Sequence, residues 1–576
     1  MLRTHLEARS YHACEPAARA LHLPSRLRGA ADLRMLAALA VAHTFGLLAP
    51  ELAEATARRV DAALAGEADA ALTQADADSV LAWCTAAAEW CERHGLDLPF
   101  GRLQGWAARA DGRVGASTAS RVHWRVAAAW HHEAFGRRRE VVDLLEDAWA
   151  LAAAAGDPAL QQVVRLKLAR LAIYRDDPSA AVARAAEVIG RADVDTAPLW
   201  LADAADIEAR AALVSGDMHR ALHQARRACA LAALAGAPAA YTLTYRTNEA
   251  YAQMALGAWA EALTVLAQMA AVPLPARLHD RVTTLADLAV LLRAERTGPW
   301  TAADDLALRA LVDRLRALDW PGVLAVLPSH IARLWARALD AGIEPDWVRA
   351  SIVGRGLAPP EPSWPEAWPW PLRVQVLGPL QVSDRDGRTL LGGSKAAARP
   401  LALLRRLAAE SGHDGMAADV LAEALWPGEG REGRHKALEV TLARLRRLLG
   451  APDALLMHDR RLRLNPQCVW LDQAALVRLL DRLTLKPPLA DVARDRAWAQ
   501  VLALWRGPVL GDDGDAPWLQ PLRLRLRQRM AAALLGDAAW PGHASRCLRA
   551  VAADPGLEPC LIAAQGSVQP TSIQRQ

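Results

Sequence analysis

Residues 418–464 read ADVLAEALWPGEGREGRHKALEVTLARLRRLLGAPDALLMHDRRLRL, and the fold of the C-terminal part depends on this stretch. The pattern predicts a short helix, a turn that starts at Pro427, a long helix that ends at Gly450 and a hairpin with Asp459-Arg460 at its tip. Four leucines of the long helix step by four, three and four residues, which gives one narrow apolar stripe. These leucines are Leu438, Leu442, Leu445 and Leu449.

The basic side chains of the long helix point away from this stripe. At about 100° per residue from Leu438, Lys436 falls at about 160°. Arg447 and Arg444 fall at about 180° and about 240°. Residues 431–463 carry nine basic and four acidic side chains, a charge of +5, whereas the whole chain carries +4. The pattern favours a local basic face that binds nucleic acid; a solvated arginine-rich face is the alternative interpretation.

Alternating strand patterns precede these helices. Residues 372–383 read LRVQVLGPLQVS and turn at Gly378-Pro379, and a third short strand, RTLLG at 388–392, follows the Asp386-Gly387 turn. A further helix, KAAARPLALLRRLAAE, spans 395–410. Strands, three helices and a terminal hairpin predict a winged helix, in which the third helix enters the major groove of DNA and the wing lies over the adjacent backbone.

A proline-rich segment separates this region from what comes before it. Residues 358–371 read APPEPSWPEAWPWP, with six prolines and three tryptophans. Proline removes amide donors and blocks helix formation, so the segment is interpreted as a linker. Its tryptophans are expected to pack it against a neighbouring domain, which makes it stiffer than a Gly/Ser tether.

Residues 1–357 are rich in Ala, Leu, Arg and Glu at helical spacing, which predicts an all-α region. Its breaks recur at intervals of forty or forty-one residues, and each is followed by a small or aliphatic pair that allows close helix packing. The breaks are Gly136, Asp176, Gly216 and Gly257, and the pairs lie at 141–142, 181–182, 221–222 and 262–263. Residues 215–232 and 256–269 look like the second helices of tetratricopeptide-type repeats. Such a stack presents a concave groove for a peptide, a partner domain or a small effector; a spacer whose helices only bury one another is the alternative.

Composition excludes several functional classes. The seven cysteines of the 576 residues form no CxxC pair, which argues against a disulfide framework and a structural zinc site. Cys84 and Cys91 are expected to be packing residues, and His131-His132 a solvated or interface pair. No signal peptide and no apolar run of about eighteen residues is found, so a cytoplasmic protein without a membrane segment is expected. We expect no catalytic constellation, no cofactor and no metal site.

Several motifs, taken in order, closely resemble the OmpR-type winged helix of bacterial SARP-like transcriptional regulators. They are LRVQVLGPLQV (372–382), Lys395 at a helix start, LAEALWP (421–427), ALEVTLARLRRLLG (437–450) and LRLNPQCVWLD (462–472). The stretch VLALWRGPVLGDDGDAPWLQPLRLRLRQRM (501–530) looks like the opening of the bacterial transcriptional activator domain that follows this winged helix in the family. The resemblance covers about residues 372–560.

The expected fold class is therefore mainly α. It comprises an N-terminal α-solenoid of tetratricopeptide-like helix pairs (1–357), the linker (358–371), the winged helix (372–472, α+β), a short, truncated activator-like helical domain (473–565) and a disordered tail (566–576). The resemblance implies a transcriptional regulator, of the activator type by family, with double-stranded promoter DNA as its partner. Three further partners are expected. They are RNA polymerase, a second copy of the chain in a homodimer on DNA, and an unknown protein or small-molecule effector that binds the repeats. The alternative is a helical-repeat scaffold or adaptor whose winged helix mediates protein interaction.

The resemblance also implies the residues that face DNA. Lys436, Thr441 and Arg444 would lie toward the major groove, and Arg446 and Arg447 would contact phosphates. Arg434 joins the same set, and Arg460 and Arg461 would be the contribution of the wing. Bidentate arginine suits guanine, whereas lysine or a wing arginine more often holds phosphate. Trp426 is expected to be a packing residue.

Overall fold

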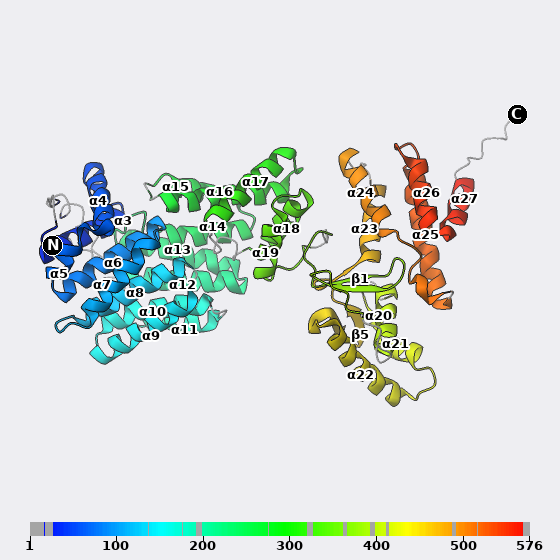
Figure 1. Ribbon diagram of the computed structural model, residues 1–576, viewed down its shortest axis with the longest axis horizontal. Helices are drawn as coiled ribbons and strands as arrows, with labels where there is room; N and C mark the ends of the chain where they lie inside the picture. The colour runs from blue at the N-terminus through cyan, green and yellow to red at the C-terminus, as the bar shows by residue number, and fades with distance from the viewer. Residues whose placement is uncertain are drawn as a thin grey trace. The chain divides into compact units, whose positions relative to one another are not determined.

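The fold is given by a computed structural model. The structure describes residues 17, 23, 27–135, 137–174, 177–191, 198–272, 274, 276–318, 327–360, 366–391, 398–410, 414–485, 491–514 and 516–567. It is mainly helical, which confirms the expected class, and the strands of this described part all lie between residues 372 and 471. The chain divides into two compact units, an N-terminal unit of Met1–Leu334 and a C-terminal unit of Trp335–Gln576 (Figure 1).

Helices follow one another through the N-terminal unit, and neighbours in the chain pack against each other. They are α3 (Ala30–Thr44), α4 (Pro50–Ala62), the π-helical turn η2 (Ala63–Glu67), α5 (Asp69–Gln74), α6 (Ala77–His94), α7 (Leu98–Asp111), α8 (Thr118–Ala134), α9 (Arg138–Ala155), α10 (Pro158–Tyr174), α11 (Pro178–Ile189), α12 (Pro198–Ser215), α13 (Met218–Leu234), α14 (Leu243–Ala255), α15 (Trp259–Ala270), α16 (Ala276–Thr297) and α17 (Ala302–Leu318). Helix α18 (Pro328–Asp340) crosses the boundary between the units.

The spacing of the expected repeat reappears in the helix starts. Helices α9, α11, α13 and α15 begin at residues 138, 178, 218 and 259. Gly216 and Gly257 have φ of +81° and +78°, so the turns after α12 and α14 use the left-handed region that favours glycine. The first residue of each expected pair is buried: Val141, Ala181, Ala221 and Ala262. Gly136 and Asp176 lie outside the described residues.

Helix α3 lies between two groups of helices. Its Leu36 belongs to a buried cluster with residues of α4 to α6. Its Leu39 belongs to another cluster, which contains Leu199 of α12 and Tyr245 of α14. Because α3 covers this side of α12 and α14, that surface is not open to a partner in this structure.

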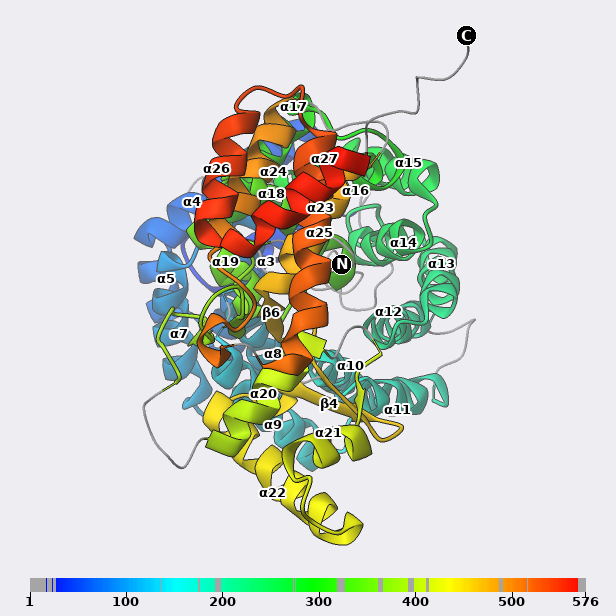
Figure 2. The ribbon, with the colours of Figure 1, turned by 90° about the vertical axis from the view of Figure 1, so that its right-hand side faces the viewer.

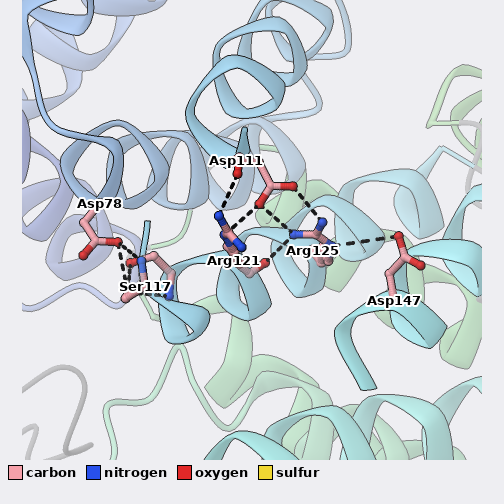
Figure 3. A network of polar contacts seen from close by, with 7 residues as sticks. Asp78, Asp111, Ser117, Arg121, Arg125 and Asp147 are labelled. Carbon is pink, nitrogen blue, oxygen red and sulfur yellow. Dashed lines mark hydrogen bonds and ion pairs between the residues drawn. The ribbon is translucent and has the colours of Figure 1, made fainter. Parts of the chain in front are cut away.

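A polar network joins α6, α7, α8 and α9 (Figure 3). Asp111 at the end of α7 lies between two arginines of α8: its Oδ2 is 2.8 Å from Nη2 of Arg125, and its backbone carbonyl accepts a hydrogen bond from Arg121. Arg125 also lies 4.0 Å from Asp147 of α9. Ser117 caps α8 and donates through its Oγ to Asp78 of α6 at 2.9 Å. These contacts set the relative positions of four successive helices.

The C-terminal unit combines helices with two small sheets. Its elements are α19 (Pro345–Gly354), β1 (Leu372–Gln375), β2 (Gln381–Asp384), α20 (Ala398–Glu410), β3 (Met416–Ala417), α21 (Ala418–Leu425), α22 (Arg431–Leu449), β4 (Leu455–His458), β5 (Arg461–Leu464), β6 (Val469–Leu471), α23 (Asp472–Thr484), α24 (Asp491–Leu504), α25 (Gln520–Gly536), α26 (His543–Ala553) and α27 (Glu558–Ser567). Lys395 lies outside the described residues, as does the expected disordered tail from 568 onward, and α27 continues to Ser567.

The strands form two sheets, and one of the expected strands is not formed. One sheet has the order β2-β1-β6, in which β1 pairs antiparallel with β2 and parallel with β6; the other has the order β3-β5-β4. The expected third strand at 388–392 is reduced to a bridge between Ser383 and Thr389. The segment after β5 leaves the hairpin at Asn465, whose side-chain amide donates to the Asp453 carbonyl and whose own carbonyl accepts from Cys468. This turn directs β6 to the other sheet.

Two features tie the first sheet to its surroundings. Trp368 and Trp370 of the proline-rich segment are buried inside the C-terminal unit, so this part of the segment is packed. Asp472, at the start of α23, accepts hydrogen bonds from the backbone amides of Val376 and Leu377 and lies 3.1 Å from Nη2 of Arg506. Burial raises the pKa of this carboxyl, which these donors and the arginine oppose. Asp472 thereby joins β1 to the C-terminal helices.

Candidate nucleic-acid interface

Helix α22 is built as the leucine spacing predicts. Gly430 precedes it in an extended conformation, and Gly450 ends it with φ of +64° in the left-handed region. All four leucines of the expected stripe are buried, and the helix packs on α20 and α21. In Figures 1 and 2, α22 lies at the outer edge of its unit, so its other side faces solvent.

The solvent side of α22 carries three basic residues. Lys436, Arg444 and Arg447 are exposed. Among the residues that the structure describes, no side chain forms an ion pair or hydrogen bond with these three. Their charges are therefore available to phosphates or base edges, the groups with which lysine and arginine bind DNA.

An apolar residue lies on the same side and escaped the sequence reasoning. Val440 is 45% exposed and lies four residues from both Lys436 and Arg444. Its position at about 200° from Leu438 would have identified it, had the same arithmetic been applied to apolar residues. A branched aliphatic side chain here can contact the methyl group of thymine in the major groove.

Thr441 must be removed from the expected set. It is only 5% exposed and lies beside Leu442 in the buried part of α22. At about 300° from Leu438, its hydroxyl belongs to the flank of the leucine stripe. Because α22 packs on α20 and α21, a buried residue on this flank does not face the solvent side of the helix.

Two of the expected arginines are engaged inside the unit. Arg446 is half-buried, and its Nη2 donates to the carbonyl of Leu455 at 3.3 Å, which ties the end of α22 to β4. Arg434 is half-buried and lies 3.7 Å from Glu423 of α21. The guanidinium groups of Arg446 and Arg434 remain near the surface, but these contacts fix the positions of the two side chains.

Carboxylates of α21 face the first turns of α22. Besides the Glu423 pair, Asp419 lies 2.8 Å from Nε2 of His435 and 3.7 Å from Nη2 of Arg431. These partly exposed pairs hold the start of α22 against α21. They also lower the positive charge at this end of the helix.

The hairpin of β4 and β5 has a two-residue turn at its tip. His458 pairs with Arg461, and the intervening Asp459 and Arg460 have φ of +47° and +58°. Positive φ at both central residues defines a type I′ turn, which matches the twist of the flanking strands. Arginine rarely adopts this conformation, so the exposed Arg460 is held at the tip against its backbone preference.

Arg461 has a different role from the one expected. Its Nε and Nη2 donate to the carbonyls of Asp414 and Gly415, both at 2.7 Å, and so bind the hairpin to the segment before β3. Gly415 has φ of +71°, and a Cβ at this position would lie 2.9 Å from the carbonyl oxygen of Leu462. Glycine is therefore required where the two segments meet, and Arg461 positions the hairpin.

Two kinds of feature were not found in the described part of the chain. It contains no group of three or more His, Cys, Asp or Glu side chains arranged to hold a metal ion. No helix among the described residues combines the length and apolarity needed to cross a membrane. Trp426 follows α21 and has the guanidinium of Arg399 over its ring at 5.9 Å, in keeping with a packing role.

No protein-family model matches the chain, and no curated protein matches it.

Proposed function

We propose that this chain is a DNA-binding transcriptional regulator that binds promoter DNA through α22 and the β4–β5 hairpin, which act as the recognition helix and wing of an OmpR-type winged helix. The observation that carries the proposal is the separation of the two sides of α22. One side is a leucine stripe that packs on α20 and α21, and the other presents unpaired basic residues to solvent. A helix with this division can lie in the major groove without losing its packing.

The arrangement suggests a division of roles. Arg444 and Arg447 carry guanidinium groups that can bind guanine or phosphate in a bidentate manner. Lys436 and Arg460 supply cations suited to DNA phosphates on either side of the groove. Val440 supplies an apolar contact between the cations.

The remaining parts have proposed roles of their own. Helices α23 to α27, joined to the first sheet through Asp472, form the activator-like segment and would contact RNA polymerase or a second copy of the chain. The N-terminal unit would be a solenoid of tetratricopeptide-like pairs that receives a protein or small-molecule signal. The forty-residue spacing of its helix starts supports this role.

One observation favours the alternative, a scaffold whose C-terminal unit binds a protein. Val440 on α22 and Met457 on β4 are both large, exposed apolar residues. A protein interface would use them together with the surrounding arginines, since interfaces combine apolar and arginine contacts.

Salt dependence and mutation separate the two functions. The full-length protein is titrated with a pool of random-sequence DNA duplexes at several salt concentrations, and a matched series uses Arg444→Ala with Arg447→Ala. DNA binding through three or four phosphate contacts predicts a log–log slope of about −3, which becomes shallower by about 1 to 2 in the double variant. Arg388→Ala, an exposed arginine at the turn after β2, serves as the control and should bind as the unchanged protein does. If the DNA affinity does not depend on salt concentration, or is the same in the double variant, this interface is ruled out.

A further inference from the structure

A cavity of about 580 Å³ lies between α9, α10 and α11 of the N-terminal unit. Cavities of roughly 300–1,000 Å³ hold small organic ligands. This cavity combines one aromatic ring, two arginines, three carboxylates and several aliphatic side chains.

The inner wall is formed by Arg165 of α10 and Trp149 of α9. The Arg165 side chain is only 10% exposed, with its Nε 3.0 Å from Oε2 of Glu187 and its guanidinium 5.0 Å from the centre of the Trp149 ring. Its Nη1 is buried and has no hydrogen-bond partner among the described residues. A buried guanidinium nitrogen without a partner is costly, because the lost hydrogen bond to water is not replaced. It is therefore a donor without an acceptor in a side chain that lines the cavity.

A second cation lies nearby. Arg184 of α11 also lines the cavity, and its Nη1 donates to the carbonyl of Leu168 at 3.3 Å, which leaves its other donors for a ligand. Leu168 and Leu171 supply the apolar part of the wall. The two arginines, Trp149 and these leucines together form a site for a ligand that has an anionic group attached to a flat apolar ring.

Acidic residues limit the charge that such a ligand can carry. Glu146, Asp177 and Glu187 line the cavity and are exposed, whereas Arg165 is buried and Arg184 half-buried. Glu187 pairs with Arg165, so the two arginines together keep about one positive charge for a ligand, and Glu146 and Asp177 are exposed to solvent. A single negative charge can reach the arginines, but a second one at the outer end of the ligand would be repelled by the carboxylates.

We propose that this cavity binds a small planar organic acid with one negative charge, its acid group toward Arg165 and Arg184 and its ring beside Trp149 and Leu168. The proposal deepens the sensing role suggested for the N-terminal unit by naming the class of ligand. Binding itself does not require the C-terminal unit to bind DNA, so the two proposals can fail separately.

The test uses the full-length protein and three naphthalene probes of similar size. Isothermal titration calorimetry measures the binding of 2-naphthoate, 2,6-naphthalenedicarboxylate and the neutral 2-naphthalenemethanol. We expect 2-naphthoate to bind about tenfold or more tightly than either of the other two. Arg165→Gln should weaken 2-naphthoate binding by about tenfold while leaving the neutral probe unchanged. Arg139→Gln, an exposed arginine of α9 outside the cavity, is the control for charge.

A second variant keeps the test independent of Arg165. Ala180→Phe fills the cavity from α11 without removing a polar contact, and it should abolish 2-naphthoate binding. The proposal is overturned if 2-naphthoate does not bind at millimolar concentration, if the neutral probe binds equally well, or if both variants bind it as the unchanged protein does. DNA binding is recorded in parallel with a random-sequence duplex, and its loss or retention does not bear on these outcomes.

Discussion

Asp419 on α21 lies 2.8 Å from Nε2 of His435 on α22, and the same carboxylate lies 3.7 Å from Arg431. Together with the pair between Glu423 and Arg434, this contact places two acidic residues against the start of the helix proposed to enter DNA. The carboxylates occupy cations that phosphates would otherwise bind. They therefore hold α22 in place and would weaken the proposed DNA binding.

Removing these carboxylate charges should strengthen DNA binding. For Asp419→Asn with Glu423→Gln, we expect affinity for duplex DNA to rise by about twofold to tenfold at low salt, and the gain to shrink as salt increases. Stability should change by less than about 1 kcal/mol, because exposed pairs contribute little. Fluorescence anisotropy measures binding, and Glu558→Gln on α27 is the control for charge. A fall in affinity would contradict this account.

Val440 should contribute to sequence preference rather than to general affinity. For Val440→Ser, we expect binding to selected sequences to weaken by about threefold to tenfold, with little change for random duplexes, because the contact to a thymine methyl is lost. Unfolding should be nearly unaffected, since the side chain is 45% exposed. Selection from a random duplex pool, followed by measurement of both affinities, checks this. Equal losses on both DNAs would mean that Val440 does not contact a base.

Arg460 should show opposite effects on stability and on binding. Arg460→Gly relieves the left-handed strain at φ of +58°, so we expect a gain of about 1 kcal/mol in urea unfolding. The same change removes a cation and should reduce the salt slope of DNA binding by about 1. Arg460→Lys is the matched variant: it keeps both the charge and the strain, and should resemble the unchanged protein. Weaker stability in the glycine variant would show that the turn is not strained.

His131 predicts a pH dependence of stability. It is fully buried, stacks on Phe100 at 3.7 Å, and burial lowers its pKa to about 4. Because the pKa in the folded protein lies below the unfolded value of about 6.5, the unfolded chain binds a proton more readily as pH falls. This stabilising contribution is complete above pH 6.5 and is lost as the pH falls from there toward 4.

Between pH 7 and pH 5 the loss should be about 2 kcal/mol. Urea unfolding at the two pH values measures it, and His131→Phe should remove most of this part of the pH dependence. His219→Gln, at an exposed histidine of α13, should leave it unchanged. An equal loss in the His131→Phe protein would assign the effect to other groups.

The interpretation of His131-His132 as a solvated or interface pair is wrong, because both side chains are buried. Cys84 and Cys91 are also buried, which confirms their packing role.

Local sequence patterns predicted the elements of the C-terminal unit well. The leucine spacing of α22 predicted which residues would be buried, and the turn at Asp459-Arg460 lies at the tip of the hairpin. Periodicity and turn preferences act over a few residues, so they can be read from the chain alone. Thr441 shows the limit of a resemblance, since simple helical geometry already placed it beside the leucine stripe.

The sequence by itself determined the mainly helical class, the spacing of the helix starts in the N-terminal unit and the buried side of α22, because each depends on local periodicity. Only the tertiary structure decided which cations are free. Arg461 is occupied by carbonyls of Asp414 and Gly415, and Arg434 is paired with Glu423, whereas Lys436 and Arg444 face solvent. The tertiary structure also decided that β6 pairs in parallel with β1. These contacts join residues far apart in the chain, and no local pattern records which carbonyl or carboxylate a long arginine side chain will reach.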